Sequence, residues 1–284
     1  CLTLHLYRRD GRGPAALPVL KHPSRMRAPR LVDCGTLRSK LRGVAPDGVA
    51  ALLGPAPLVA KVSTAGAGGV FSYSEDDANA TKRDVGAARF GVAFEDCDAA
   101  GLVAACAAQR KSGERRYWTG PYRGDDGAWW PVPDAASLPR ATALWVGGYG
   151  STTQAHYDVA DNVLGQVAGR KRVRLWPPAA HECLHVFPDA HPRARKAQLD
   201  VDDPAGGGYA LGAGLGAPAL DVVLEPGDAL AIPAFWFHHC EALDLSCSLN
   251  AFFPSRTAAL AAEVLAAPRP DGADLRSELG RDLA

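Results

Sequence analysis

The spacing of one aspartate and three histidines constrains the fold of this chain more than any other feature of its sequence. His156 and Asp158 flank Tyr157, and a His238-His239 pair follows about eighty residues later. In an extended segment, residues two apart point to the same side, so His156 and Asp158 can reach one ion. A third ligand must come from another strand, because no further position on the first strand lies within reach. Two imidazoles and one carboxylate on one face of an ion are typical of iron(II) sites that keep positions open for a co-substrate and for oxygen.

The segment 167–176 alternates like a strand and places a lysine on its apolar side. Lys171 shares its parity with Val173 and Leu175. A buried ammonium is costly unless an anion meets it, so an inward lysine near a metal site suits a co-substrate carboxylate. A protein carboxylate as partner, or a bulge that turns Lys171 outward, would explain the pattern as well.

The opposite parity of the same segment is basic. It carries Arg170, Arg172 and Arg174, and Arg193, Arg195 and Lys196 follow in the next loop. These residues form either a local stripe that binds nucleic acid or a solvated strand face next to a charged loop.

Short strands separated by tight turns dominate the second half of the chain. Residues 221–225 and 228–233 flank a Pro226-Gly227 turn, and a further strand is expected over 245–253. This pattern, without a long helix between the strands, predicts a closed or sandwiched antiparallel barrel. Neighbouring residues on a strand face opposite ways, so only one of His238 and His239 can be a metal ligand. Periodicity alone leaves both open.

Residues from about 144 to 253 resemble the JmjC branch of the iron(II)/2-oxoglutarate oxygenases. The matching stretches are 152–158, Asn162, 166–177 and 225–238. The resemblance implies a mainly β fold, a double-stranded β-helix (jelly-roll or cupin-like) barrel with flanking N- and C-terminal helices. It also implies Fe(II) as the metal and 2-oxoglutarate as the co-substrate.

The same resemblance assigns roles to single residues. The histidine directly after the aromatic pair is the family's third ligand, which selects His238 over His239. Lys171, fifteen residues after His156, matches the lysine that holds the far carboxylate of 2-oxoglutarate. The catalytic and metal-binding set is then His156, Asp158 and His238. The set for the co-substrate is Lys171 with Thr153, Asn162 and Asn250.

The activity implied by the resemblance is hydroxylation of a macromolecular substrate, a tRNA or a protein. Residues 156–162, 169–173 and 232–238 are similar to the family's hydroxylases of the tRNA base wybutosine, whereas residues 244–248 are closer to its small protein hydroxylases. We therefore expect a wybutosine-type tRNA base as substrate. The alternatives are a protein side-chain hydroxylase or lysine demethylase with the same core, and a non-catalytic cupin-like module that binds partners.

Composition excludes several other classes. Lys+Arg and Asp+Glu both total 31, so no global charge attracts nucleic acid. The seven cysteines show no C-x-x-C pairing, which argues against a zinc module or a disulfide scaffold and for a reducing compartment. No segment approaches the roughly 18 apolar residues of a membrane span. We expect a cytoplasmic or nuclear protein without a membrane partner. The basic N-terminus is also compatible with location in an organelle.

The expected organisation has three parts. Residues 1–36 form a basic leader, disordered or partly cut because the chain begins at Cys1; residues 37–256 form the catalytic domain; residues 257–284 form a C-terminal helical segment. The apolar face of that segment would make a homodimer or pack on the barrel.

Local patterns predict further elements around the barrel. Helices are expected over 37–42, 49–53 and 94–109, and strands over 58–63, 69–73 and 115–119. Tyr117, Trp118, Tyr122, Trp129 and Trp130 would floor a substrate cleft, stack a base or pack in the core. The insert 178–219 would frame the active site or be disordered, with His181, His185 and His191 at the surface.

Overall fold

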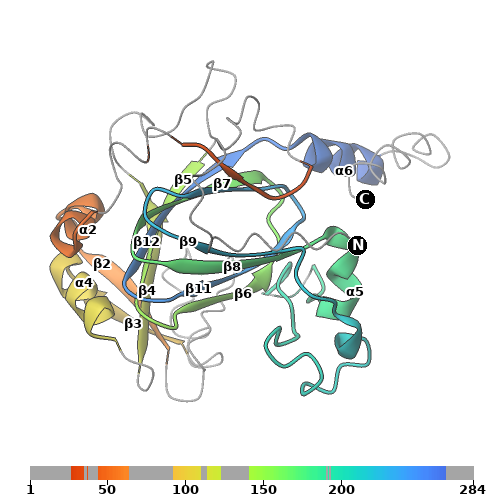
Figure 1. Ribbon diagram of the computed structural model, residues 1–284, viewed down its shortest axis with the longest axis horizontal. Coiled ribbons are helices and arrows are strands. Elements are labelled where there is room, and N and C mark those ends of the chain that lie inside the picture. The colour runs from red at the N-terminus through yellow and green to blue at the C-terminus, as the bar shows by residue number, and fades with distance from the viewer. Residues whose placement is uncertain are drawn as a thin grey trace, which may run out of the picture.

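The described part of the chain is mainly antiparallel β-structure (Figure 1). The computed structural model describes residues 27–34, 37, 44–63, 92–109, 114–122, 141–189, 191 and 193–266. Two sheets, one of eight strands and one of four, face each other, and the smaller sheet has the order β6-β11-β8-β9. The expected jelly-roll barrel is confirmed.

Strands β5 to β12 make the barrel. The larger sheet contributes β5 (Ala141–Gly147), β7 (Asp161–Ala168), β10 (Ala229–Ile232) and β12 (Ser246–Phe253). The smaller sheet consists of β6 (Thr152–His156), β8 (Lys171–Trp176), β9 (Leu220–Leu224) and β11 (Phe237–Ala242). Within the larger sheet these four strands have the order β10-β7-β12-β5, and all their pairings are antiparallel.

Four further strands extend the larger sheet, and helices lie beside the barrel. Its outer strands are β1 (Arg30–Val32), β2 (Leu58–Ser63), β3 (Val92–Cys97) and β4 (Arg115–Pro121). Helices α2 (Pro46–Leu53) and α4 (Ala99–Ala108) lie together beside β2 and β3, whereas α6 (Arg256–Ala266) lies at the other end of the barrel (Figure 1). No helix in the described ranges is long and apolar enough to cross a membrane.

Two apolar clusters stabilise the barrel. Side chains from both sheets fill the space between them: Leu164, Val173, Leu175, Leu220, Val222, Leu224, Leu230 and Ile232. The second cluster joins Val163 and Val167 of β7 to Leu37, Val49 and Val103 on the other face of the larger sheet. Strand β7 is therefore buried at every position. A strand covered on both faces is a rigid base for the groups attached to its ends.

Two glycine turns place the strands that carry the candidate site. Gly169 has φ +62 between β7 and β8, and a Cβ there would lie 1.8 Å from the carbonyl oxygen of Leu245, so only glycine fits. Gly227 has φ +94 in the turn from β9 to β10, where the Asp228 carboxylate accepts a hydrogen bond from Glu225 N at 3.0 Å. The predicted Pro226-Gly227 turn is confirmed.

The insert between β8 and β9 packs on the smaller sheet. It contains the short helices η6 (Pro178–Ala180), α5 (His181–Leu184) and η7 (Gly212–Gly214). In the insert, the side chains of Leu184, Ala197 and Leu199 are buried and pack against Trp176 and Phe237 of the sheet. The insert is thus an ordered part of the barrel wall where the structure describes it.

Several local predictions are confirmed, and the expected start of one helix is wrong. Helix α2 covers the expected 49–53, β2 and β4 cover 58–63 and 115–119, and α6 covers most of the C-terminal helix. The predicted helix over 94–109 begins only at Ala99, because its first residues extend β3 and pair with β2. Within the expected leader 1–36, predicted to be disordered or partly cut, residues 30–32 form β1, which pairs with β10; residues 1–26 lie outside the described residues. The strand over 69–73, residues 38–42, Trp129, Trp130 and residues 267–284 lie outside the described residues.

Asp161, at the start of β7, is a buried carboxylate whose protonation should control stability. It accepts a hydrogen bond from Ala234 N at 2.9 Å, yet burial raises its pKa from the usual 3.8 to about 7. Between these values the native chain keeps a proton that the unfolded chain has lost, so this contribution to stability falls as pH rises. We expect Asp161→Asn to be the more stable protein at pH 8, by a few kcal/mol, and to keep an advantage of only about 1–2 kcal/mol at pH 5. Urea unfolding at both pH values checks this, and equal pH slopes for the two proteins would contradict it.

Candidate functional site

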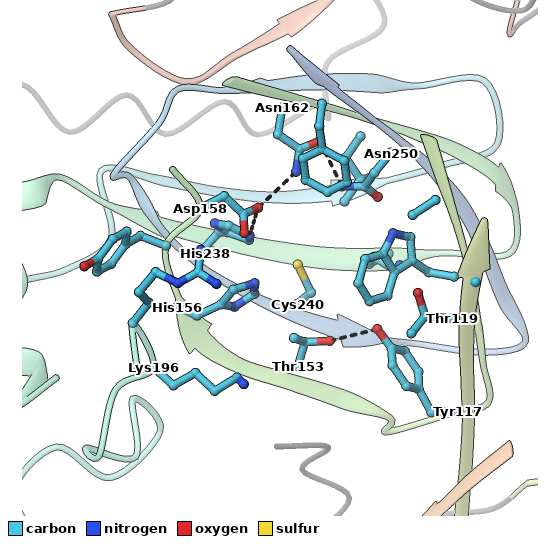
Figure 2. Close-up of a pocket in the computed structure, with 18 of the residues that line it drawn as sticks. Tyr117, Thr119, Thr153, His156, Asp158, Asn162, Lys196, His238, Cys240 and Asn250 are labelled. Carbon is cyan, nitrogen blue, oxygen red and sulfur yellow. Dashed lines mark hydrogen bonds and ion pairs between the residues drawn. The ribbon is translucent and has the colours of Figure 1, made fainter. Parts of the chain in front are cut away.

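Strand pairing brings His156, Asp158 and His238 together. His238 on β11 lies opposite His156 on β6, and their ring centroids are 4.2 Å apart. The ligand atoms of these two histidines and Asp158 all lie within 4.8 Å of one another, the spacing of a metal-ligand group (Figure 2). The antiparallel pairing of β11 with β6 therefore brings the third candidate ligand from a second strand, as the sequence analysis expected.

Both histidines of this group offer Nε2 to the shared centre. The Nδ1 atom of His156 lies 2.7 Å from the carbonyl oxygen of Gln154, and Nδ1 of His238 lies 3.1 Å from that of Trp236. A carbonyl oxygen only accepts, so each Nδ1 must carry the proton and each Nε2 keeps its lone pair. This arrangement orients an imidazole for metal binding.

Backbone and amide contacts hold Asp158 in place. The carbonyl oxygen of Asp158 accepts from Phe235 N at 2.8 Å, and Phe235 has φ +66, a conformation that non-glycine residues rarely adopt. The amide of Asn162 lies 3.5 Å from an oxygen of Asp158, and its own oxygen accepts from Asn250 at 2.9 Å (Figure 2). Asn162 and Asn250 thus act on the orientation of the carboxylate.

The electrostatics of this group suit a bound cation. Burial, followed by the nearby His238, lowers the pKa of His156 well below its usual 6.5, so its imidazole is neutral at physiological pH. Burial raises the pKa of Asp158, since few water molecules can solvate the carboxylate there. A divalent cation would offset that cost and needs neutral imidazoles as ligands.

His239 faces away from this group. Its Nδ1 lies 3.2 Å from a guanidinium nitrogen of Arg174, and Arg174 also pairs with Asp202 at 2.7 Å. Strand alternation therefore separates the two neighbouring histidines as the sequence demanded. Asp202 comes from the insert, so this network ties the insert to the outer side of the smaller sheet.

The basic stripe of Arg170, just before β8, and of Arg172 and Arg174 on β8 is paired with acidic residues. The three ion pairs are Arg170–Asp244 at 2.9 Å, Arg172–Asp221 at 2.6 Å and Arg174–Asp202 at 2.7 Å. Arg174 is moreover buried, so the expectation of a purely solvated strand face is wrong for that residue. Neutralised in this way, the stripe is a weak attractor for phosphates.

A cavity of about 420 Å³ opens beside the three candidate ligands. All seven residues expected at the site line it: Thr153, His156, Asp158, Asn162, Lys171, His238 and Asn250. Apolar side chains, among them Leu164 and Phe252, line other parts of its wall. The structure brings these seven residues together around one cavity, and their roles in binding a metal and a co-substrate stay predictions.

Lys171 ends inside the barrel, as its parity predicted. It is buried, and its ammonium donates a short hydrogen bond to the hydroxyl of Ser248 on β12. Burial lowers its pKa from the usual 10.5. In the part of the chain that the structure describes, Lys171 makes no ion pair with a carboxylate. A buried ammonium that meets only a neutral hydroxyl is an unfinished anion site.

Two further residues around this cavity, Trp145 and Ser248, escaped the sequence reasoning, whereas Tyr117 belongs to the aromatic cluster that was expected to floor a cleft, stack a base or pack in the core. Tyr117 of β4 lies with its hydroxyl 3.2 Å from that of Thr153 (Figure 2). Among the residues that the structure describes, the indole nitrogen of Trp145 and the side-chain oxygen of Asn250 are buried without a hydrogen-bond partner, so a bound molecule could satisfy both. The missed signal for Ser248 was its parity with Asn250 on one strand.

The insert contributes the last part of the cavity wall. Ala194, Arg195 and Lys196 line the cavity, so the expectation that the insert frames the site is confirmed. The insert histidines lie outside the candidate metal group. His181 is exposed as expected, whereas His185 and His191 are half-buried.

Comparison with known proteins gives one family and two kinds of relatives. Residues 50–259 match the family described as Cupin-like domain. The "tRNA wybutosine-synthesizing protein 5" of Danio rerio is 40% identical over 98 residues, which cover 34% of this chain and 28% of that protein. The "Lysine-specific demethylase 8" of Xenopus tropicalis is 32% identical over 125 residues, which cover 42% of this chain and 28% of that protein. This chain thus spans less than a third of the length of either relative.

Proposed function

This chain belongs to the cupin-like domain family, and we propose that it is an iron(II)- and 2-oxoglutarate-dependent oxygenase. Its reaction would hydroxylate a C–H bond of a macromolecular substrate. The proposal is supported most by one observation: the unfinished anion site at Lys171 shares a cavity with His156, Asp158 and His238. A metal group alone would suit many chemistries, whereas a metal group beside a buried ammonium suits a chelating dicarboxylate.

The three candidate ligands fit iron(II). Two neutral imidazoles and one carboxylate bind one face of such an ion and leave positions open. The chemistry that iron(II) and 2-oxoglutarate supply when bound is oxidative decarboxylation of the co-substrate coupled to hydroxylation of the substrate. The chain orients the ligands through the Nδ1 contacts of His156 and His238 and through Phe235, which holds the backbone of Asp158.

The residues for 2-oxoglutarate lie on both sheets. Lys171 would bind its far carboxylate, with Ser248 and the Thr153–Tyr117 pair as neighbouring hydroxyls. The indole N–H of Trp145, which has no hydrogen-bond partner within the described ranges, is a further donor for a carboxylate oxygen. The apolar wall beside them limits water, and low hydration strengthens each of these contacts.

We favour a tRNA base of the wybutosine type as substrate. The relative in Danio rerio, at 40% identity, is named for wybutosine synthesis in tRNA. A protein side chain is the second candidate, because relatives named lysine-specific demethylase match longer segments at lower identity. Either substrate would place the reaction in the cytoplasm or nucleus. A homodimer through α6 stays a prediction; Leu260 of that helix is buried and Leu265 is 86% exposed.

Substrate-dependent formation of succinate tests the proposal. The purified chain is given iron(II), 2-oxoglutarate and either total tRNA or a mixture of histone and ribosomal peptides. We expect succinate to rise with tRNA, and mass spectrometry of the digested nucleosides to show a gain of one oxygen atom. A rise with peptides instead would favour a protein hydroxylase or demethylase. A chain that binds neither iron(II) nor 2-oxoglutarate would be a non-catalytic binding module.

A further inference from the structure

Of the three candidate metal ligands, Asp158 lies in a loop and the two histidines lie in strands. The loop runs from the end of β6 at His156 to the start of β7 at Asp161. Figure 2 shows the carboxylate of Asp158 between Asn162 and His238, whose Nε2 lies 3.7 Å away. Strand register fixes the two histidines, so other contacts must fix the loop if Asp158 is to stay beside them.

The insert holds the first part of this loop. Residues 195–197 run as an added strand along β6: Tyr157 N donates to the carbonyl oxygen of Arg195 at 3.2 Å, and Ala197 N donates to that of Ala155 at 2.7 Å. Both bonds involve backbone groups that precede the ligand in the chain. The position of the ligand itself therefore depends on contacts with another segment.

That segment is the turn 233–236, which leads into β11. Two consecutive amides of this turn point toward the loop. Ala234 N donates to a carboxylate oxygen of Asp161 at 2.9 Å. Phe235 N donates to the carbonyl oxygen of Asp158 at 2.8 Å. The turn is thus joined to the loop at the metal ligand and again at the residue where the loop ends.

The shape of the turn depends on these contacts. Phe235 has φ +66, a left-handed conformation that a non-glycine residue keeps only when its surroundings hold it. Trp236 N donates to the carbonyl oxygen of Pro233 at 3.2 Å, and the carbonyl oxygen of Trp236 accepts from Nδ1 of His238 at 3.1 Å. A turn that relaxed would therefore withdraw Phe235 N from Asp158 and change the orientation of the His238 ring at the same time.

Asp161 holds the turn from a rigid strand. It is 2% exposed, and without its oxygen the N–H of Ala234, itself a buried residue, would lose its partner. The hydroxyl of Ser255 bonds the same carboxylate, and Asp161 lies opposite Phe253 in the pairing of β7 with β12. Burial raises the pKa of Asp161 to about 7, but a carboxyl group in either protonation state keeps an oxygen that accepts from Ala234 N.

We propose that Asp161 is a positioning residue of the candidate metal site, whose side-chain acceptor holds the turn 233–236 against the loop and so fixes the places of Asp158 and His238. This inference rests on the metal site of the proposed function and adds to it a residue that is not a ligand. The competing explanation is that Asp161 stabilises the fold through Ser255 alone. It predicts a loss of stability without a change at the metal.

Cobalt(II) binding tests the proposal without turnover, because the visible absorption of bound cobalt(II) depends on the arrangement of its ligands. The metal-free chain is titrated with cobalt(II) under anaerobic conditions. Asp161→Leu has a side chain of similar shape without an acceptor, whereas Asp161→Asn keeps an acceptor oxygen. Ser255→Ala is the matched control, since it removes the other hydrogen bond of the same carboxylate and leaves the contact with Ala234 N in place.

We expect Asp161→Leu to weaken cobalt(II) binding by about 10–100-fold and to change the absorption spectrum, since groups that orient a metal ligand change metal affinity by that amount. Asp161→Asn and Ser255→Ala should keep the affinity and the spectrum of the parent. A folded Asp161→Leu protein with the parent's affinity and spectrum would overturn the proposal. An equal loss of affinity in Ser255→Ala would overturn it as well, because the effect would then follow stability.

A second variant covers the case in which Asp161→Leu does not fold. Asp161→Ala leaves room for a water molecule that can accept from Ala234 N. The rise of the thermal midpoint with added cobalt(II) reports the affinity even of a protein with low stability. We expect a smaller rise in Asp161→Ala than in Asp161→Asn at the same cobalt(II) concentration. If neither Leu nor Ala gives a folded protein while Asn does, Asp161 serves global stability and the proposal is wrong.

Amide hydrogen exchange separates this inference from the proposed function. In the metal-free chain, the exchange rate of the Phe235 amide reports its bond to Asp158. We expect Asp161→Leu to speed this exchange and Ser255→Ala to leave it unchanged. A parent that binds neither cobalt(II) nor iron(II) but shows this difference would contradict the oxygenase and keep the contact between turn and loop. Metal and 2-oxoglutarate binding with no effect of Asp161→Leu on either measurement would keep the oxygenase and reject the role of Asp161.

Discussion

Replacing His238 with alanine will remove tight iron(II) binding, whereas the same change at its neighbour His239 will not. His238 belongs to the group whose ligand atoms lie within 4.8 Å of one another, and His239 points to Arg174 on the opposite face of β11. Loss of one of three ligands should weaken iron(II) binding by roughly 100-fold or more, since even residues that only orient a ligand change metal affinity by 10–100-fold. Anaerobic calorimetry with iron(II) measures the difference.

The control variant, His239→Ala, should itself be less stable than the parent protein. His239→Ala removes an acceptor from Arg174, which stays paired with Asp202, so the folded state should lose about 1–3 kcal/mol. Thermal unfolding of both variants separates this loss of stability from a loss of metal binding. If His239→Ala abolished iron(II) binding in a folded protein while His238→Ala kept it, the assignment of the third ligand would be wrong.

Replacing Lys171 with methionine will remove 2-oxoglutarate binding and leave iron(II) binding in place. Lys171 is buried, and in the described part of the chain its ammonium meets only the Ser248 hydroxyl, so the co-substrate carboxylate is the expected counter-ion. Truncating one partner of a buried, hydrogen-bonded charge pair costs about 2–5 kcal/mol, which corresponds to roughly 30-fold to several thousand-fold in affinity. Calorimetry with 2-oxoglutarate on the iron-loaded protein measures the loss.

The same variant should be no less stable than the parent when no co-substrate is bound. Burial lowers the pKa of Lys171, which means that the folded chain disfavours the charge. Replacing a buried charge by an apolar side chain of similar length is often neutral or stabilising, here by about 1 kcal/mol. Unchanged 2-oxoglutarate affinity in Lys171→Met, or a large loss of stability without the co-substrate, would remove the main support for the oxygenase.

Most of the candidate site could be predicted because strand alternation is a short-range rule. Two-residue spacing placed His156 and Asp158 on one side, and parity placed Lys171 inside the barrel. The same rule could only say that His238 and His239 face opposite ways. Choosing His238 needed the family resemblance, and the register of β11 against β6 gives the geometric reason.

What the sequence could not predict depends on long-range pairing. Strand β1 has three residues and is held in place by pairing with the edge of β10. No local sequence pattern predicts so short a strand. The first residues of the helix expected from 94 belong instead to strand β3, because they pair with β2. Lys196 lies in a loop without periodicity, and only its β-bridge to His156 shows that it reaches the cavity.

The added strand of the insert also covers one edge of the smaller sheet. Strand β6 is the outermost strand of the smaller sheet, and an uncovered edge of that kind is a template on which another chain can add a strand. Backbone bonds from Arg195 and Ala197 cover that edge beside Ala155 and Tyr157. A shortened insert would therefore expose unpaired backbone groups along β6, the strand that carries His156. Pairing of that edge with another chain would then compete with folding. The length of this loop therefore affects how well the edge of the smaller sheet is protected from pairing with another chain.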